Sequence, residues 1–144
     1  MRYRDSMHFP YPCRQVFDLV ADIERYPEFL PGWKYARVVD RSDNFLLAEQ
    51  QLRAGLAVFD FHTKALLELC CGIHITANDG PFRELYIDWF FTPISVVDCR
   101  VAVDLGLTMK PCLVNGALQL LLETGSSELL PLFERRARML YSRD

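Results

Sequence analysis

Three histidines are the side chains of this sequence best suited to acid–base chemistry near neutral pH. His62 and His74 lie in segments where polar and apolar residues alternate, and both fall among the polar residues. His8 lies in a shorter segment with the pattern of a first strand. A catalytic base for a buried ligand must point toward that ligand. We therefore predict that all three histidines lie on the surface and that the protein has no catalytic residue.

Other signatures of catalysis or metal binding are missing from the sequence. It contains no motif for phosphate cradling, for zinc binding or for a serine nucleophile. The five cysteines show no C-x-x-C spacing, which predicts free thiols in a reducing compartment; they are Cys13, Cys70, Cys71, Cys99 and Cys112. Cys70 and Cys71 are expected to be small core residues. We expect no cofactor and no metal.

Composition and charge limit the classes of partner. The 144 residues are 51% hydrophobic and 24% charged, which predicts one globular domain spanning residues 1–144. A net charge of −3 gives no general attraction to nucleic acid. No apolar run reaches the roughly 18 residues that span a bilayer. The expected location is therefore the cytoplasm, and peripheral contact with the inner membrane is left open.

Alternation of polar and apolar residues predicts an antiparallel sheet with one buried face. The strongest segments are residues 57–69, 71–78, 82–91 and 99–109, preceded by a hairpin at 33–40 and 44–52 and a first strand at 2–9. Helical spacing predicts two short helices over 13–22 and 23–29 and helical stretches over 112–123 and 129–141. The predicted class is α+β, a curved sheet of six to seven strands wrapped around a long C-terminal helix. Such an arrangement can enclose a cavity.

The inward faces of the strands supply candidate ligand-binding residues. Two polar residues share these faces, Thr63 and Arg83, and Arg83 fits either a rim residue or a hydrogen-bond donor to a polar head group. The apolar candidates for the cavity are Phe59, Phe61, Leu85, Trp89, Phe91, Val103 and Leu105. Glu49, Gln51 and Arg53 alternate along their predicted strand and so lie on the same face of it. The sequence of this segment does not reveal whether that face is buried or exposed.

The segment "ERYPEFLPGW" places four large apolar residues between prolines in a predicted turn, whereas connecting loops are usually polar. The four are Tyr26, Phe29, Leu30 and Trp33. We expect this segment to form a lid over the cavity mouth or a loop that touches lipid. The alternative is that the segment caps the core and does not move.

Several stretches resemble one known family across nearly the whole chain. They are "VFDLVADIERYPEFLP" at 16–31, "DGPFREL" with Trp89 and Phe91 at 79–91, "RVAVDLGL" at 100–107 and "PLFERRARML" at 131–140. Together they resemble the coenzyme Q-binding START-domain family of the START-like, polyketide-cyclase-like helix-grip superfamily. The chain departs from the family pattern at Pro12-Cys13, where a hydroxyl residue and proline are usual, at Gly32, and in a longer tail after Pro111.

The resemblance implies a function without catalysis. Members of the family look like carriers of polyprenyl quinones in an apolar tunnel, so the expected ligand is a ubiquinone-like molecule used in respiration or quinone synthesis. Two alternatives come from the same superfamily, a ribosome-association toxin and an aromatic polyketide cyclase/dehydrase. The net charge of −3 disfavours the first alternative, and the outward position predicted for the histidines disfavours the second.

Overall fold

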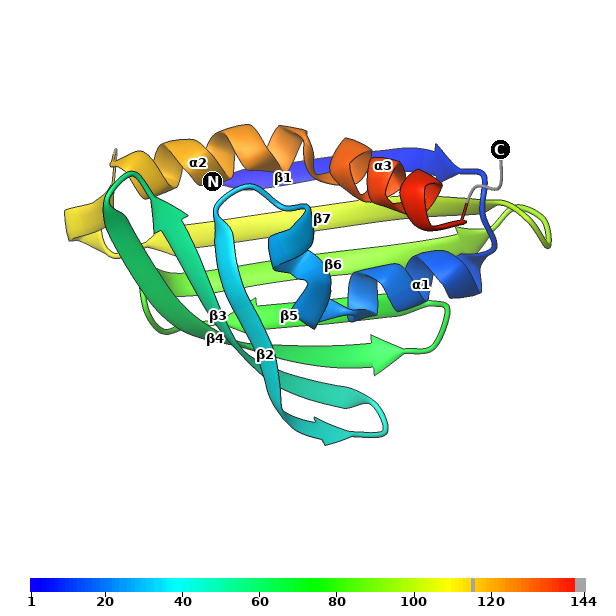
Figure 1. The fold of residues 1–144 in the computed structure, drawn as a ribbon, viewed down its shortest axis with the longest axis horizontal. Helices are drawn as coiled ribbons and strands as arrows, with labels where there is room; N and C mark the ends of the chain where they lie inside the picture. The colour runs from blue at the N-terminus through cyan, green and yellow to red at the C-terminus, as the bar shows by residue number, and fades with distance from the viewer. Residues whose placement is uncertain (115, 142–144) are drawn as a thin grey trace.

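Seven strands form one antiparallel sheet, and helices lie against one of its faces (Figure 1). The computed structural model describes residues 1–114 and 116–141 of the chain. In chain order the elements are β1 (Arg2–Phe9), α1 (Cys13–Ala21), η1 (Ile23–Glu28), β2 (Trp33–Ser42), β3 (Phe45–Ala54), β4 (Ala57–Glu68), β5 (Gly72–Ala77), β6 (Phe82–Pro93), β7 (Cys99–Met109), η2 (Pro111–Leu113), α2 (Ala117–Ser127) and α3 (Leu129–Tyr141).

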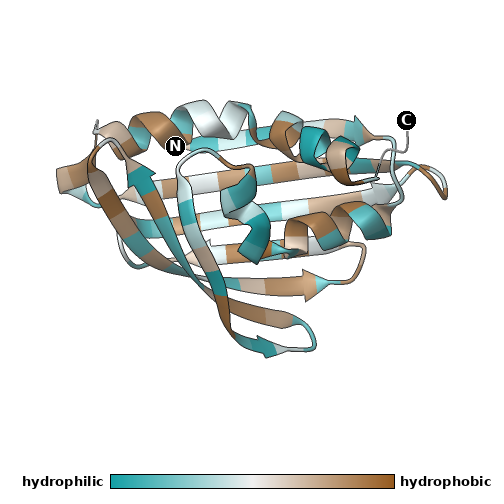
Figure 2. Ribbon diagram, viewed as in Figure 1, coloured by the Kyte–Doolittle hydropathy of each residue, from teal (hydrophilic) through white to brown (hydrophobic). Residues whose placement is uncertain are grey.

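The order of the strands follows from short connections. β2 to β7 pair in sequence order, and β1 returns to pair with β7, so that β1 and β2 form the two edges. Every neighbouring pair is antiparallel. Polar and apolar residues alternate along the strands, as the banding in Figure 2 shows, and in β4 and β7 the predicted apolar face is the buried one. The structure confirms the predicted helix-grip fold.

The helices differ from the prediction in three details. The second short element, η1, is a 3₁₀ helix that contains Pro27. The predicted break between the two C-terminal helical stretches is present, but it lies at Glu128, since α2 includes residues 124–127; α2 and α3 run one after the other across the sheet (Figure 1). The helix expected from Cys112 begins only at Ala117, because residues 111–113 form a 3₁₀ turn; Asn115 lies outside the described residues. No helix in the described ranges is long and apolar enough to cross a membrane.

Two groups of buried side chains fill the space between the sheet and the helices. The first group is rich in aromatic rings and joins α1, η1 and α3 to the sheet; Phe17, Trp89, Phe91 and Phe133 belong to it. The second group joins α2 to strands β3, β4, β6 and β7. A cavity lies mainly within the second group, under α2 and the first turn of α3.

The cysteines correct the expectation of free thiols. Cys13 at the start of α1 and Cys99 at the start of β7 form a disulfide, with α-carbons 5.0 Å apart and a sequence separation of 86 residues. Cys70 and Cys71 are not core residues, because they occupy the turn between β4 and β5, where Cys70 has a φ of 59°. Their side chains, like that of Cys112, carry free thiols.

Candidate functional site

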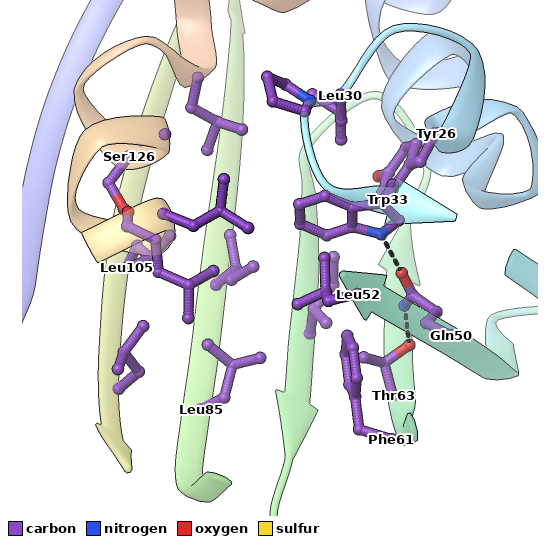
Figure 3. Close-up of a pocket in the computed structure, with 18 of the residues that line it drawn as sticks. Tyr26, Leu30, Trp33, Gln50, Leu52, Phe61, Thr63, Leu85, Leu105 and Ser126 are labelled. Carbon is purple, nitrogen blue, oxygen red and sulfur yellow. Dashed lines mark hydrogen bonds between the residues drawn. The ribbon is translucent and has the colours of Figure 1, made fainter. Parts of the chain in front are cut away.

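An apolar cavity of about 80 Å³ lies between the sheet and α2 (Figure 3). Strands β3 to β7 form its floor, α2 forms one wall, and the segment after η1 forms the opposite wall. None of its lining residues carries a charge. The lining consists of Tyr26, Leu30, Pro31, Trp33, Gln50, Leu52, Phe61, Thr63, Ile75, Phe82, Leu85, Ile87, Leu105, Leu107, Leu121, Leu122, Gly125, Ser126, Leu129 and Leu132.

Half of the residues predicted from the sequence to bind a ligand meet at this cavity. The six are Tyr26, Leu30, Trp33, Phe61, Leu85 and Leu105. They come from four separate segments of the chain, and strand alternation turns Phe61, Leu85 and Leu105 toward the same side of the sheet.

Three further candidates lie in the solid part of the core and not at the cavity. Trp89, Phe91 and Val103 are buried among the residues of the first group. The Trp89 ring is covered by Phe133 of α3, with ring centroids 5.0 Å apart, and it stacks on Phe91. The expectation that Trp89 faces the cavity is therefore corrected: its strand face is the predicted one, but α3 fills the space above it.

Phe29 and Phe59 also lie outside the cavity lining, and each is partly buried. Phe29 packs against the first group of core residues, where its ring meets Phe133 edge-on, with ring centroids 5.0 Å apart. Phe59 packs against the second group. Both side chains therefore contribute to the core and not to the lining of the cavity.

Arg83 is exposed and does not reach the cavity. The pairing of β6 with β7 shifts between Phe82 and Glu84, so the strand carries an irregularity at this position. Such a bulge moves the neighbouring side chains to the opposite face. Phe82 is consequently buried and lines the cavity, whereas the exposed position of Arg83 does not fit the alternative of a donor to a ligand head group.

The segment from η1 to β2 packs down onto the core. Leu30 is 5% exposed, and Tyr26 donates a hydrogen bond from its hydroxyl group to the backbone oxygen of Val20. Burial, helped by the nearby Asp22 carboxylate, raises the pKa of the Tyr26 phenol, which therefore stays protonated. The apolar side chains of this segment face the protein interior, so the structure fits the alternative of a packed wall better than a loop that projects toward lipid.

Gly32 connects this wall to α2. Its φ of +82° lies in the left-handed region, and a Cβ at this position would collide with the side chain of Leu121 from α2. The glycine that departs from the family pattern is therefore the residue that allows α2 to close against the turn before Trp33.

A chain of hydrogen bonds crosses the otherwise apolar cavity. Trp33 donates from Nε1 to Oε1 of Gln50 over 2.7 Å, and Gln50 donates from Nε2 to Oγ1 of Thr63 over 2.7 Å (Figure 3). Gln50 and Thr63 are 5% and 2% exposed, so both amide and hydroxyl are removed from bulk water. These three residues supply the polar groups that can orient a ligand on the sheet side of the cavity.

The sequence interpretation missed Gln50 and the wall formed by α2. A signal for Gln50 was present, because Leu46, Ala48 and Leu52 share its parity and are apolar. The residues of α2 that line the cavity are Leu121, Leu122, Gly125 and Ser126. No pattern within α2 alone indicates which of its many apolar residues faces a cavity.

The histidines lie outside the cavity, each beside an aspartate. His62 Nδ1 lies 2.8 Å from Asp79 Oδ2, His74 Nδ1 lies 3.1 Å from Asp88 Oδ1, and His8 Nε2 lies 2.9 Å from Asp98 Oδ1. The hydrogen bond with Asp79 is the main cause that raises the pKa of His62. None of the three lines the cavity, in agreement with their predicted outward position.

A buried arginine ties α3 to η1 beside the cavity. Arg136 is 9% exposed and donates from Nη2 to Oε1 of Glu28 over 2.7 Å. Its guanidinium carbon lies 5.2 Å from the ring centroid of Phe29, a cation–π contact. The hydrogen bond from Arg136, with a second from Arg25, lowers the pKa of the Glu28 carboxyl group. This contact holds the η1 wall against the last helix.

The sequence and the fold have counterparts among known proteins. The model of a family described as "Polyketide cyclase / dehydrase and lipid transport" matches residues 9–131. A protein of Pseudomonas aeruginosa named ribosome association toxin RatA is 33% identical over 136 residues, which cover 94% of each chain.

Two solved structures share the fold at low sequence identity. The Zhui aromatase/cyclase of Streptomyces sp. R1128 superposes with a TM-score of 0.82 at 10% identity, over 99% of this chain and 97% of that one. A START superfamily protein of Mycobacterium smegmatis superposes with a TM-score of 0.79 at 16% identity, over 96% and 98% of the two chains. At these identities the likeness establishes the fold alone.

Proposed function

The chain belongs to the polyketide cyclase/dehydrase and lipid transport family, and on that premise we propose that it binds a polyprenyl quinone such as ubiquinone in the cavity under α2. The observation that supports this proposal most is the lining, which is apolar apart from a few neutral polar groups and contains no charge. A quinone head joined to an isoprenoid tail presents the same combination, a large apolar surface with neutral oxygen atoms. We expect binding and carriage of the ligand without chemical change.

The magnitude of hydrophobic burial favours a ligand with a tail. Burying one isoprene unit of five carbons contributes up to ~4 kcal/mol, at about 0.8 kcal/mol per carbon. Ordering the flexible tail offsets part of this gain. Two or three buried units therefore support a dissociation constant on the order of micromolar.

The size of the cavity requires α2 to move when such a ligand enters. Pockets for ligands of this size commonly have volumes of roughly 300–1,000 Å³, whereas this cavity has about 80 Å³. α2 is suited to move, because Gly116 at its N-terminus provides no side-chain cap and Gly125 lies within it. Only Leu118 and Ser126 of α2 are fully buried. We expect displacement of α2 to extend the cavity toward the solvent.

No group of the cavity is suited to acid–base catalysis. Tyr26 is the one titratable residue among its lining, and its hydroxyl proton is engaged by the Val20 backbone oxygen. The three histidines lie outside the cavity, each beside one aspartate. These placements support a carrier role in respiratory electron transport or quinone synthesis over a cyclase role.

Titration with a short-tailed ubiquinone tests the proposal. Trp33 lines the cavity, so its fluorescence should be quenched saturably by bound quinone. Leu105→Phe fills the cavity and should weaken binding by about tenfold or more, whereas Leu66→Phe makes the same change at an exposed position and should leave it unchanged. Equal quenching of both variants and the wild type would contradict binding in this cavity.

A second candidate function is association with the ribosome. It is favoured by the relative named ribosome association toxin, whose identity of 33% extends over 94% of this chain. Co-sedimentation of the purified protein with ribosomes and with separated subunits tests it directly. Retention in the ribosome fractions at physiological salt by both wild type and Leu105→Phe would establish a surface function that does not depend on the cavity.

A further inference from the structure

The hydrogen-bond chain in the cavity has a defined direction. The indole Nε1 of Trp33 can only donate, so the amide oxygen of Gln50 must face it. The amide nitrogen of Gln50 then faces Thr63 and donates to Oγ1. Because the Thr63 oxygen accepts this bond, its own hydroxyl proton is free to donate to a further acceptor. The chain therefore ends in a donor.

That donor has no partner within residues 1–114 and 116–141. No described residue accepts a hydrogen bond from the Thr63 hydroxyl, although the side chain is 98% buried and lines the cavity. A buried donor without an acceptor is unfavourable, because it has lost its hydrogen bond to water. Polarisation along the two preceding hydrogen bonds makes the terminal proton a better donor still. The cavity thus contains a buried donor that a ligand oxygen can satisfy.

The other hydroxyl groups of the cavity cannot play this part. Tyr26 donates to the backbone oxygen of Val20, and Ser126 donates to the backbone oxygen of Leu122 over 2.6 Å. Both hydroxyl protons are therefore already used. Thr63, with the second amide proton of Gln50 beside it, supplies the donors that remain for a ligand.

The charge of the lining limits the ligand further. No lysine, arginine or histidine lines the cavity, so a carboxylate or phosphate head would lose its hydration without gaining a counter-charge. We propose that Thr63 and Gln50 form a head-group subsite that selects uncharged ligands with a hydrogen-bond-accepting oxygen, such as a ketone or quinone carbonyl, over anionic lipids and over plain hydrocarbons. This inference rests on the proposed binding of a ligand in the cavity and adds the class of its head group.

Three small aromatic probes separate these classes. Acetophenone carries an acceptor carbonyl, ethylbenzene has nearly the same shape without it, and benzoate is anionic. Each is titrated into ¹⁵N-labelled protein while the indole N–H signal of Trp33 is followed, because that group begins the hydrogen-bond chain. Thr63→Val removes the hydroxyl at nearly constant volume, and Thr63→Ser retains it. The dissociation constant of each probe is compared between the wild type and the variants. The hydration free energy of the probe is the same in each such comparison and therefore cancels.

We expect Thr63→Val to weaken acetophenone binding by about tenfold, with ethylbenzene binding unchanged or tighter, and Thr63→Ser to restore the wild-type preference. We expect no saturable binding of benzoate. Equal effects of Thr63→Val on acetophenone and ethylbenzene, or saturable binding of benzoate in the cavity, would overturn the head-group subsite while the cavity itself remained a binding site. Absence of binding by all three probes would instead contradict the proposed function.

Discussion

Gln50 on β3 and Thr63 on β4 are joined by a 2.7 Å hydrogen bond inside an apolar cavity. The register pairs Ala48 with Thr63 and Gln50 with Phe61, so the two polar residues are diagonal neighbours on the buried face. A buried polar side chain lowers the stability of the fold unless it forms hydrogen bonds that replace those it made with water. Because both side chains line the cavity, they are placed to form hydrogen bonds with the polar head of a ligand whose apolar body occupies the rest of the cavity.

Leu30 tests whether the segment after η1 is a wall or a mobile lid. If the segment were the mobile lid expected from the sequence, Leu30→Asp would impair ligand transfer at little cost in stability. Because Leu30 is buried and lines the cavity, we now expect a loss of about 3 kcal/mol or more. For a chain of this length that lowers the Tm by about 10 °C, measured by circular dichroism.

Ile94→Asp provides the matched control for this prediction, because Ile94 is exposed on the loop between β6 and β7. It should change the Tm by no more than a degree or two. A Leu30→Asp variant as stable as this control would show that the segment opens freely and that the lid interpretation was right.

His62 links stability to pH through its raised pKa. The His62 imidazole binds its proton more tightly in the folded state than in the unfolded state. Its contribution to the free energy of unfolding is therefore fully present below the unfolded-state pKa of about 6.5, and it is lost as the pH rises through the folded-state pKa. Stability of the wild type, measured by urea denaturation from pH 5 to pH 9, should therefore decline over this window relative to His62→Gln.

His8→Gln leaves the pair of His62 and Asp79 intact and should retain the part of the pH dependence that comes from this pair. Quinone binding by His62→Gln should equal that of the wild type, because His62 lies outside the cavity. A tenfold loss of binding in this variant, with the fold intact, would assign the histidine a functional role that the structure does not predict.

Arg136 is predicted to stabilise the junction of α3 and η1. Arg136→Gln removes the hydrogen bond to Glu28 and the cation–π contact with Phe29, so the Tm should fall by several degrees. Arg138→Gln breaks an exposed pair with Glu134 on the same helix and should have little effect. If the two variants have the same Tm, Arg136 does not stabilise the contact between α3 and η1.

The link between Cys13 and Cys99 predicts a defined number of reactive thiols. Alkylation of the protein unfolded without reductant should modify three cysteines, and after reduction it should modify five. Closure of a loop of this length stabilises the fold by about 4–5 kcal/mol in the chain-entropy treatment, so Cys13→Ala should lower the Tm clearly. Modification of all five cysteines without reductant would contradict the disulfide.

Most of the fold was predicted from the alternation of polar and apolar residues along the strands. The residues that this alternation placed wrongly were misplaced for specific structural reasons. The outward positions of His62 and His74 and the inward position of Thr63 followed directly from parity. Arg83 was placed inward because the register shift next to Phe82 leaves no signature in the sequence. Parity cannot predict what covers a face, so Trp89 was assigned to a cavity that Phe133 in fact fills.

The sequence patterns could not predict which distant segments of the chain contact each other. The disulfide joins two cysteines separated by 86 positions, and nothing in their spacing distinguishes them from the other three. Gln50 lies on a strand whose inner face we left unassigned, although its apolar neighbours of equal parity now identify that face. The position of the cavity depends on which face of α2 meets the sheet, and the approach of Leu121 to Gly32 is one of the contacts there that sequence patterns do not predict.

Organic extraction of freshly purified protein, followed by mass spectrometry of the extract, tests the central claim most directly. The account predicts a polyprenyl quinone in amounts comparable to the protein, strongly reduced in extracts of Leu105→Phe and unchanged in extracts of Leu66→Phe purified in parallel. An extract of the wild type without quinone, or with anionic lipid at the same level in all three proteins, would contradict it.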